Sequence, residues 1–289
     1  MSNVAGVVAT FGEGPADEDI DQVRSISSPA PRSRERWLRL ALPLTTIAVL
    51  LGAWQLSSIW VNPIEFSSPG AIIGDYRYLI ESGTLGHALS TTMTEWAISL
   101  GIGLSGGLAL GVFMGRYRWF ERLMSPFVNF VNATPRVVLI PLLIVWIGIS
   151  GEGRVIFTVL SNIFVVLFNT MAGVKNVRAL YVDVGRSLGL SDRAVTWRIR
   201  VPGAIPYILA GTRFAASASL VGLIVAQMEF SNVGVGYLIL QYGTNLETDK
   251  MLAVLAVTSV IGLILVFVFK FIEKTFFNWV RETSSFGRR

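Results

Sequence analysis

The sequence predicts an all-α polytopic membrane protein with about six transmembrane helices. Of its 289 residues, 52% are hydrophobic and only 15% are charged, and the mean hydropathy is +0.59. Such values are typical of membrane proteins and not of soluble ones. Apolar stretches of roughly 20 residues, the length that crosses the hydrocarbon core, also recur along the chain. The predicted spans are 38–59, 91–114, 124–149, 153–174, 205–228 and 251–273.

The chain ends differ in composition from the predicted membrane domain, residues 37–280. Residues 1–36 combine an acidic cluster with a stretch rich in Ser, Pro and Arg, which predicts a disordered leader. The first span is too long for the apolar region of a signal peptide, so it is interpreted as a true span. Residues 281–289 form a short polar tail.

Lys and Arg residues are distributed unequally on the two sides of the predicted spans. Nineteen lie in the leader, in the tail and in the connections that face the same side as these. Three, Arg77, Arg154 and Lys250, lie on the opposite side. Because Lys and Arg concentrate on the cytoplasmic side of membrane proteins, both termini are expected in the cytoplasm. The net charge of +5 follows from this topology and requires no nucleic-acid partner.

The second span carries a glycine every four residues, at Gly103, Gly107, Gly111 and Gly115. These lie on one helix face and predict a seam at which another helix approaches closely. Residues 103–106 also match a G-x-S-G nucleophile pattern, but a nucleophilic serine needs an adjacent base. The only histidine, His87, lies outside the spans, and the chain has no cysteine. Neither a catalytic residue nor a metal site is therefore expected.

Polar residues inside or at the ends of the spans are candidates for a substrate pathway. A charge at mid-depth of a membrane is costly unless it faces a cavity or a partner. Arg136 could face an anionic substrate in a pore, or it could be a structural arginine that reaches an interface. Glu95, early in the second span, is expected to be solvated or paired with a loop. The candidate pathway residues are Thr134, Arg136, Gln227 and Glu229.

The connection between the fourth and fifth spans, residues 175–203, is long, polar and basic. Apolar residues recur at helical spacing through its first half. Gly189 can adopt the left-handed conformation that follows a helix end, and Ser191 can cap a second short helix. Pro202 is expected to push Val201 out of helical geometry and end that helix. The predicted hairpin could lie on the lipid surface or dock onto another protein.

The spacing within this hairpin resembles the EAA loop of bacterial importer permeases of the ATP-binding-cassette (ABC) class. That pattern is E-A-A, three residues, Gly, nine residues and I-x-L-P. Asp replaces Glu, Val and Gly replace the alanines, and Val replaces Leu; the glycine weakens the first helix by up to about 1 kcal/mol. The residues at the pattern positions are Asp183, Val184, Gly185, Gly189, Ile199, Val201 and Pro202.

Shorter matches extend the resemblance over residues 40–280 and are similar to the nitrate, taurine and alkanesulfonate branch of these permeases. They comprise Phe66–Pro69, Ile140–Leu142, Trp146–Ile149 and Gly234–Ile239. Two departures stand out. The branch commonly has V-A-E-M near the end of the fifth span, where this chain has Gln227 in place of the acid and Glu229 two residues later. Arg136 replaces an apolar residue or proline.

The resemblance implies the permease subunit of an ATP-driven importer in the bacterial inner membrane. Its coupling residues would be Asp183, Gly185, Gly189, Ile199 and Pro202. Its partners would be two ATPase subunits that bind ATP and Mg, a second permease copy in a homodimer, and a periplasmic or lipid-anchored substrate-binding protein. The chain itself lacks a G-x-x-x-x-G-K-[ST] phosphate loop, so no cofactor is expected in it.

The expected substrate is a small anion or zwitterion, such as a sulfonate, nitrate or carboxylate. Two other classes of protein remain as alternatives. A secondary transporter driven by an ion gradient would show broken helices and internal repeats, and no repeat is evident. An intramembrane enzyme would need a cluster of acids, histidines or metal ligands within the spans.

Overall fold

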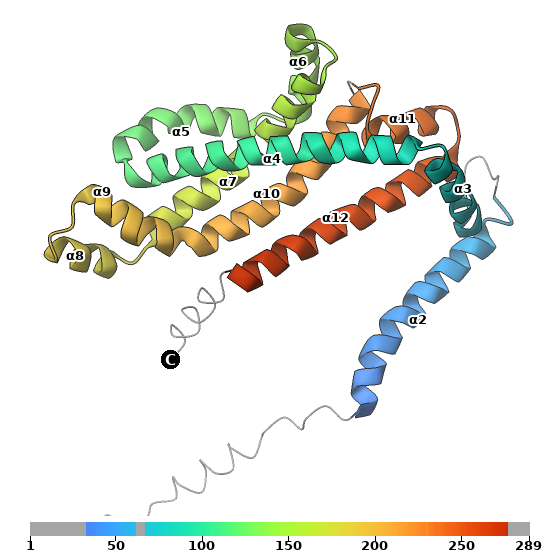
Figure 1. The fold of residues 1–289 in the computed structure, drawn as a ribbon, viewed down its shortest axis with the longest axis horizontal. Coiled ribbons are helices and arrows are strands. Elements are labelled where there is room, and N and C mark those ends of the chain that lie inside the picture. Colours follow the sequence, from blue (N-terminus) through green and yellow to red (C-terminus); the bar gives the residue numbers. More distant parts are fainter. Residues whose placement is uncertain (1–32, 62–66, 230, 277–289) are drawn as a thin grey trace, which may run out of the picture. The chain divides into compact units, whose positions relative to one another are not determined.

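A computed structural model describes residues 33–61, 67–229 and 231–276, and these residues form helices joined by short turns, with no strand among them (Figure 1). Most of the predicted leader, and the whole predicted tail, lie outside the described residues. The chain divides after Ser57 into two units. The first contains α2 (Ser33–Ser57), whose described apolar part is Ala41–Ser57. It corresponds to the first predicted span.

The second unit contains the remaining helices. By length and composition, four helices among the described residues can cross a membrane: Thr84–Arg116, Gly151–Asn176, Asp192–Glu229 and Thr248–Thr275. The elements in chain order are α3 (Pro69–Glu81), α4 (Thr84–Arg116), α5 (Arg118–Ala133), η1 (Arg136–Leu139), α6 (Ile140–Ile147), α7 (Gly151–Asn176), α8 (Ala179–Ser187), α9 (Asp192–Val195), η2 (Thr196–Arg200), α10 (Val201–Glu229), α11 (Val235–Thr244) and α12 (Thr248–Phe276).

The third predicted span, 124–149, is not one straight helix. The axis turns by 93° between α5 and the η1–α6 segment. Thr134 has extended backbone angles (φ −73°, ψ 127°) and precedes Pro135. A residue before proline is disfavoured in helical geometry, which accounts for the break at this point. Counted as one span, the bent pair gives up to five candidate spans in the described chain.

The core of the second unit is built on α7, which packs along both α4 and α10 (Figure 1). Four glycines of α4, the predicted seam residues Gly103, Gly107, Gly111 and Gly115, face α7. A methyl group built on Gly107 would lie 2.7 Å from both Ile163 O and Val166 Cβ, and one on Gly111 would lie 2.6 Å from Thr170 Cβ. The close approach of α4 to α7 also brings Gly103 against Asn162 and Gly115 against Val174. Only glycine permits this separation of the two backbones.

Shorter helices cover the two ends of this core. Helices α8 and α9 lie at the end of α4 that contains Arg116, and α11 lies at the other end (Figure 1). Beside α11, α3 packs against α12. There the Tyr76 hydroxyl donates to Ala253 O at 3.0 Å, and burial raises the pKa of Tyr76.

Candidate functional site

The predicted hairpin is formed by α8, a turn at Gly189, and the short α9 and η2. Gly189 has φ +78°, the left-handed conformation that the sequence analysis expected of it. The turn is closed by backbone bonds from Leu188 N to Val184 O (3.0 Å) and from Leu190 N to Gly185 O (3.1 Å). The Ser191 hydroxyl then accepts from Ala194 N at 3.3 Å and caps α9. The backbone therefore fixes the angle between the two arms.

The inner face of α8 packs against the second arm of the hairpin. Val182 and Gly185 are buried in α8, and Val195 is buried in α9. The Cδ1 atom of Ile199 occupies the space into which a Cβ on Gly185 would project. The family pattern has alanine at position 185. In this chain the residue is glycine, and a methyl group of Ile199 fills the space that the alanine methyl would take. Two of the predicted coupling residues, Gly185 and Ile199, are brought together in this way.

The outer face of α8 is exposed and apolar, although the helix lies in a polar connection. Leu180, Tyr181, Val184 and Leu188 are each at least half exposed, and Leu188 reaches 77%. Asp183 is exposed in the same helix. Contiguous apolar side chains on a rigid turn are typical of a surface that another protein or a membrane covers.

Pro202 does not end the second helix, and that prediction is wrong. The chain is helical without interruption from Asp192 to Glu229, and Val201 has helical angles (φ −64°, ψ −48°). Pro202 therefore lies inside this continuous helix, where its missing N–H removes one backbone hydrogen bond. The turn before it, η2, is π-helical, with Val201 N bonded to Thr196 O. Because of this continuity, the hairpin is directly connected to the long α10.

A buried polar network, which no motif in the sequence predicted, lies at the opposite end of α4. The Arg154 guanidinium of α7 donates to both oxygens of Glu95 at 2.5 to 3.2 Å. Gln227 of α10 donates from Nε2 to Glu95 Oε2 at 2.9 Å. Its Oε1 accepts from the Thr92 hydroxyl at 3.0 Å and from Gly236 N at 3.1 Å. Four elements, α4, α7, α10 and α11, are therefore joined through one ion pair and one amide.

These contacts correct the expectation for Glu95, which is 8% exposed and paired with a charge in another helix of the core. Glu95 and Arg154 are 59 residues apart, in no shared motif, so spacing gave no indication of the pair. Two features of the sequence pointed to the pair. The two side chains carry opposite charges, and each lies near the start of its own apolar span. Gln227 is fully buried and committed to protein partners, so its role in a substrate pathway stays a prediction.

The other candidate pathway residues lie apart from this network. Arg136 is in the bend between α5 and α6, partly buried, with its guanidinium 3.4 Å from Asn132 Oδ1. Within the described chain it has no carboxylate partner. The Thr134 hydroxyl donates to Phe130 O at 3.0 Å. Glu229 is exposed at the end of α10. A pathway role for these residues likewise stays a prediction.

Known transport proteins are similar to this chain in sequence. The family model described as binding-protein-dependent transport system inner membrane component matches residues 107–278. The chain is 30% identical over 249 residues to the putative aliphatic sulfonates transport permease protein SsuC of Escherichia coli (strain K12), covering 85% of this chain and 94% of that protein. It is 25% identical over 263 residues to the taurine transport system permease protein TauC of the same organism, covering 87% and 95%.

Solved structures share the fold. An inward-facing structure of the MetNI methionine ABC transporter matches with a TM-score of 0.58 at 16% identity, covering 64% of this chain and 92% of that one. A crystal structure of an amino acid ABC transporter with histidines matches with a TM-score of 0.57 at 18% identity, covering 69% and 97%. The family match spans more than half of the chain, and the hairpin and the glycine seam both lie at least partly within it. The chain therefore belongs to the family of binding-protein-dependent transport system inner membrane components.

Proposed function

We propose that this permease forms the translocation pathway of its importer and is driven by separate ATPase subunits that dock on the hairpin. The observation that supports this best is the exposed apolar face of α8, which lies outside the predicted spans beside Asp183. The Gly189 turn presents this face on a compact two-helix unit, as a docking element requires.

The continuous helix from Asp192 to Glu229 suggests how docking would be transmitted. A movement of the hairpin would shift the start of α10 directly, with no flexible joint between them. The far end of α10 holds Gln227, which is bonded to Glu95 and to the backbone of α11. Alternating access needs two states that bound ligands favour differently, and rigid helices that tilt together can supply them.

The assembly we propose has two copies of this permease, two ATPases that bind ATP and Mg, and an external substrate-binding protein, periplasmic or lipid-anchored. The hairpin and both termini would face the cytoplasm, in accordance with the distribution of Lys and Arg. ATP hydrolysis would take place in the partner subunits, because this chain lacks a phosphate loop.

The proposed substrate is a small anion or zwitterion of the sulfonate class. Relatives with 25 to 30% identity are named as aliphatic sulfonate and taurine permeases. Arg136, partly buried at the α5–α6 bend without a carboxylate partner in the described chain, provides a cation that could face such a substrate. Arg136→Gln should lower uptake of an alkanesulfonate without lowering the amount of folded permease in the membrane.

The coupling proposal is tested by purifying tagged permease from native membranes and measuring co-purified ATPase. Leu188→Asp places a charge on the apolar face of α8, and we expect it to remove the ATPase. Leu246→Asp is the matched control, because Leu246 is also exposed (67%) and lies in the connector before α12, far from the hairpin in the chain. Its φ of +61° is one that Asp tolerates.

Equal ATPase recovery in both variants would contradict docking on α8. The absence of any ATPase from wild-type preparations, with uptake that follows an ion gradient, would instead identify a secondary transporter.

A further inference from the structure

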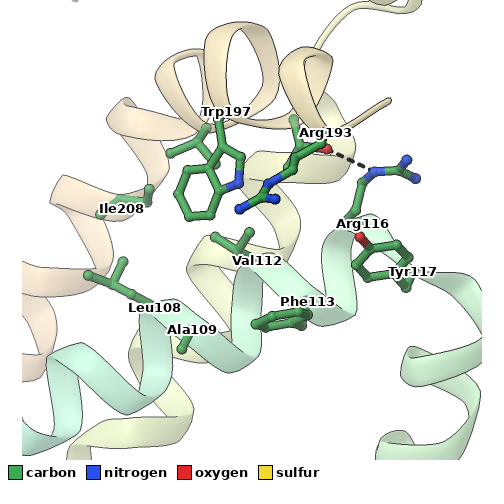
Figure 2. A pocket seen from close by; sticks show the side chains of 11 residues that line it. Leu108, Ala109, Val112, Phe113, Arg116, Tyr117, Arg193, Trp197 and Ile208 are labelled. Carbon is green, nitrogen blue, oxygen red and sulfur yellow. Dashed lines mark hydrogen bonds between the residues drawn. The ribbon is translucent and has the colours of Figure 1, made fainter. Parts of the chain in front are cut away.

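A cavity of about 720 Å³ opens between α4, η2 and α10, next to the hairpin (Figure 2). One part of its lining, which we call the floor, is apolar and includes Leu108, Val112 and Phe113 of α4 and Ile208 of α10. The part nearer the hairpin, which we call the mouth, carries Arg116, Arg193 and Trp197. The cavity thus has two chemically different parts, an apolar floor and a cationic, aromatic mouth.

The Arg193 guanidinium has no ion pair or side-chain hydrogen bond with any residue that the structure describes. It points toward the Trp197 indole and Val112, into the cavity (Figure 2). Arg116 points away and is held by Thr196 Oγ1 at 2.8 Å and by Asp192 at 3.3 Å (Figure 2). Among the residues that line the mouth in the described chain, Arg193 is therefore a cation that is free to bind a ligand.

Around the mouth in the described chain, the positive charges outnumber the one carboxylate, Asp192, that pairs with them. Asp192 accepts from Arg186 at 3.2 Å as well as pairing with Arg116. Arg200 lies within electrostatic reach of the same three residues, and its buried Nε has no acceptor in the described chain. Several guanidinium groups thus share one carboxylate, so an anion at the mouth would be stabilised.

The apolar floor lies deeper along α4 than the cations. Ala109 and Arg116 are seven residues apart, which is roughly 10 Å at 1.5 Å per residue. Ala109 itself is exposed to the cavity. A free anion such as phosphate would occupy the mouth and leave this floor without a ligand group, and the acidic side chains of a peptide would do the same. A molecule with an anionic head and an apolar tail would cover both parts.

We propose that this cavity binds an acidic phospholipid of the cytoplasmic leaflet, with its phosphate on Arg193 and an acyl chain against Val112 and Phe113. Guanidinium groups bind phosphate through charge-assisted, often bidentate hydrogen bonds. Basic pockets between transmembrane helices on the cytoplasmic side are known to hold anionic headgroups. The assignment to the cytoplasmic leaflet rests on the proposed orientation of the permease, with the hairpin in the cytoplasm. The binding of the lipid to the cavity does not depend on that orientation.

The bound lipid would brace the joint between the hairpin and α10. Arg193 belongs to α9, and Trp197 belongs to η2, the π-helical turn through which the hairpin continues into α10. A headgroup on Arg193 and a chain along α4 would tie this joint to α4. The lipid would thereby stiffen the element that transmits ATPase movement.

Native mass spectrometry of the purified full-length permease in a neutral detergent tests the proposal. Phosphatidylglycerol and phosphatidylcholine are titrated separately, and we expect a saturable phosphatidylglycerol adduct on the wild type. Arg193→Gln should weaken this adduct by about tenfold or more, the loss expected for one charge-assisted contact. Arg198→Gln is the matched control, since Arg198 is exposed in η2, carries the same charge and does not line the cavity.

Two further experiments test the floor and the mouth of the cavity separately. Ala109→Trp fills the floor without changing charge and should also displace the lipid. Glycerol phosphate, which has the head without the chains, should not compete. Equal binding by Arg193→Gln and Arg198→Gln, or full competition by glycerol phosphate, would overturn the proposal. So would binding that vanishes when two copies of the chain associate, because the second copy would then occupy the cavity.

Failure here is distinguishable from failure of the coupling proposal. Lipid binding is measured on the permease alone, whereas coupling is measured by ATPase recovery with the Leu188 variant. Arg193→Gln is expected to retain the ATPase.

Discussion

The two ends of α4 carry charges that are organised in opposite ways. Around Glu95 the charges are buried, paired one to one and surrounded by amide and backbone donors. Around Arg116, about 30 Å away at 1.5 Å per residue, the guanidiniums of Arg116 and Arg186 share Asp192 and remain partly exposed. A balanced, enclosed set of charges holds helices together, whereas an unbalanced, open set is available to bind a partner. The difference indicates a structural role for one end, and for the other it supports the recognition role that we propose.

Breaking the buried pair should give the largest effect. Glu95→Gln leaves the Arg154 guanidinium buried without a counter-charge, and arginine does not deprotonate to relieve this. Removing one partner of a buried pair costs about 3–5 kcal/mol. We expect a large drop in the thermal unfolding midpoint of the detergent-purified permease.

The double variant Glu95→Gln with Arg154→Gln removes the isolated charge and should recover part of the loss. If Glu95→Gln alone were as stable as the wild type, the network would not hold the helices together. A structural role for the Glu95 end of α4 would then be contradicted.

The glycine seam between the two ends should give the next largest effect. Gly107→Leu places side-chain atoms where Ile163 O and Val166 Cβ already lie, within 2.7 Å of the new Cβ. Overpacking of this kind costs about 1–3 kcal/mol, and more where backbone atoms prevent relaxation. Folded yield and unfolding temperature should both fall.

Gly101→Leu is the control for the seam, because nothing lies within 4 Å of a Cβ at that position in the same helix. Equal losses in the two variants would mean that leucine harms α4 by itself and that the close contact with α7 is not the cause.

The smallest effect is expected for an ion pair that is exposed. Arg77 and Glu81 lie 2.7 Å apart on α3, with side chains 85% and 63% exposed. Solvent screens such a pair, so Arg77→Gln should change stability by about 1 kcal/mol or less. Urea or thermal unfolding of Arg77→Gln and Glu95→Gln, measured in parallel, would show whether burial of an ion pair decides how much stability is lost. Similar losses in the two variants would mean that burial does not matter.

Several features could be predicted from the sequence because they depend on local chemistry. The left-handed turn at Gly189, the Ser191 cap and the spacing of the α4 glycines each follow from the conformational limits of a single residue or a fixed helical repeat. The all-α membrane class followed from composition and from the recurrence of long apolar stretches. The family resemblance rested on the same short-range spacing.

Other features were decided only by the tertiary structure, because they join residues that are distant in the chain. The sequence shows that Glu95 and Arg154 are charges near span ends, but only the packing of α4 on α7 places them in contact. Pro202 was expected to stop a helix, yet a π-helical turn before it lets α10 continue from the hairpin. Arg193 is one of many arginines in sequence, and the cavity beside Trp197 distinguishes it. Local propensity sets where helices start and turn, whereas the free energy of burying and pairing charges is settled only once the helices meet.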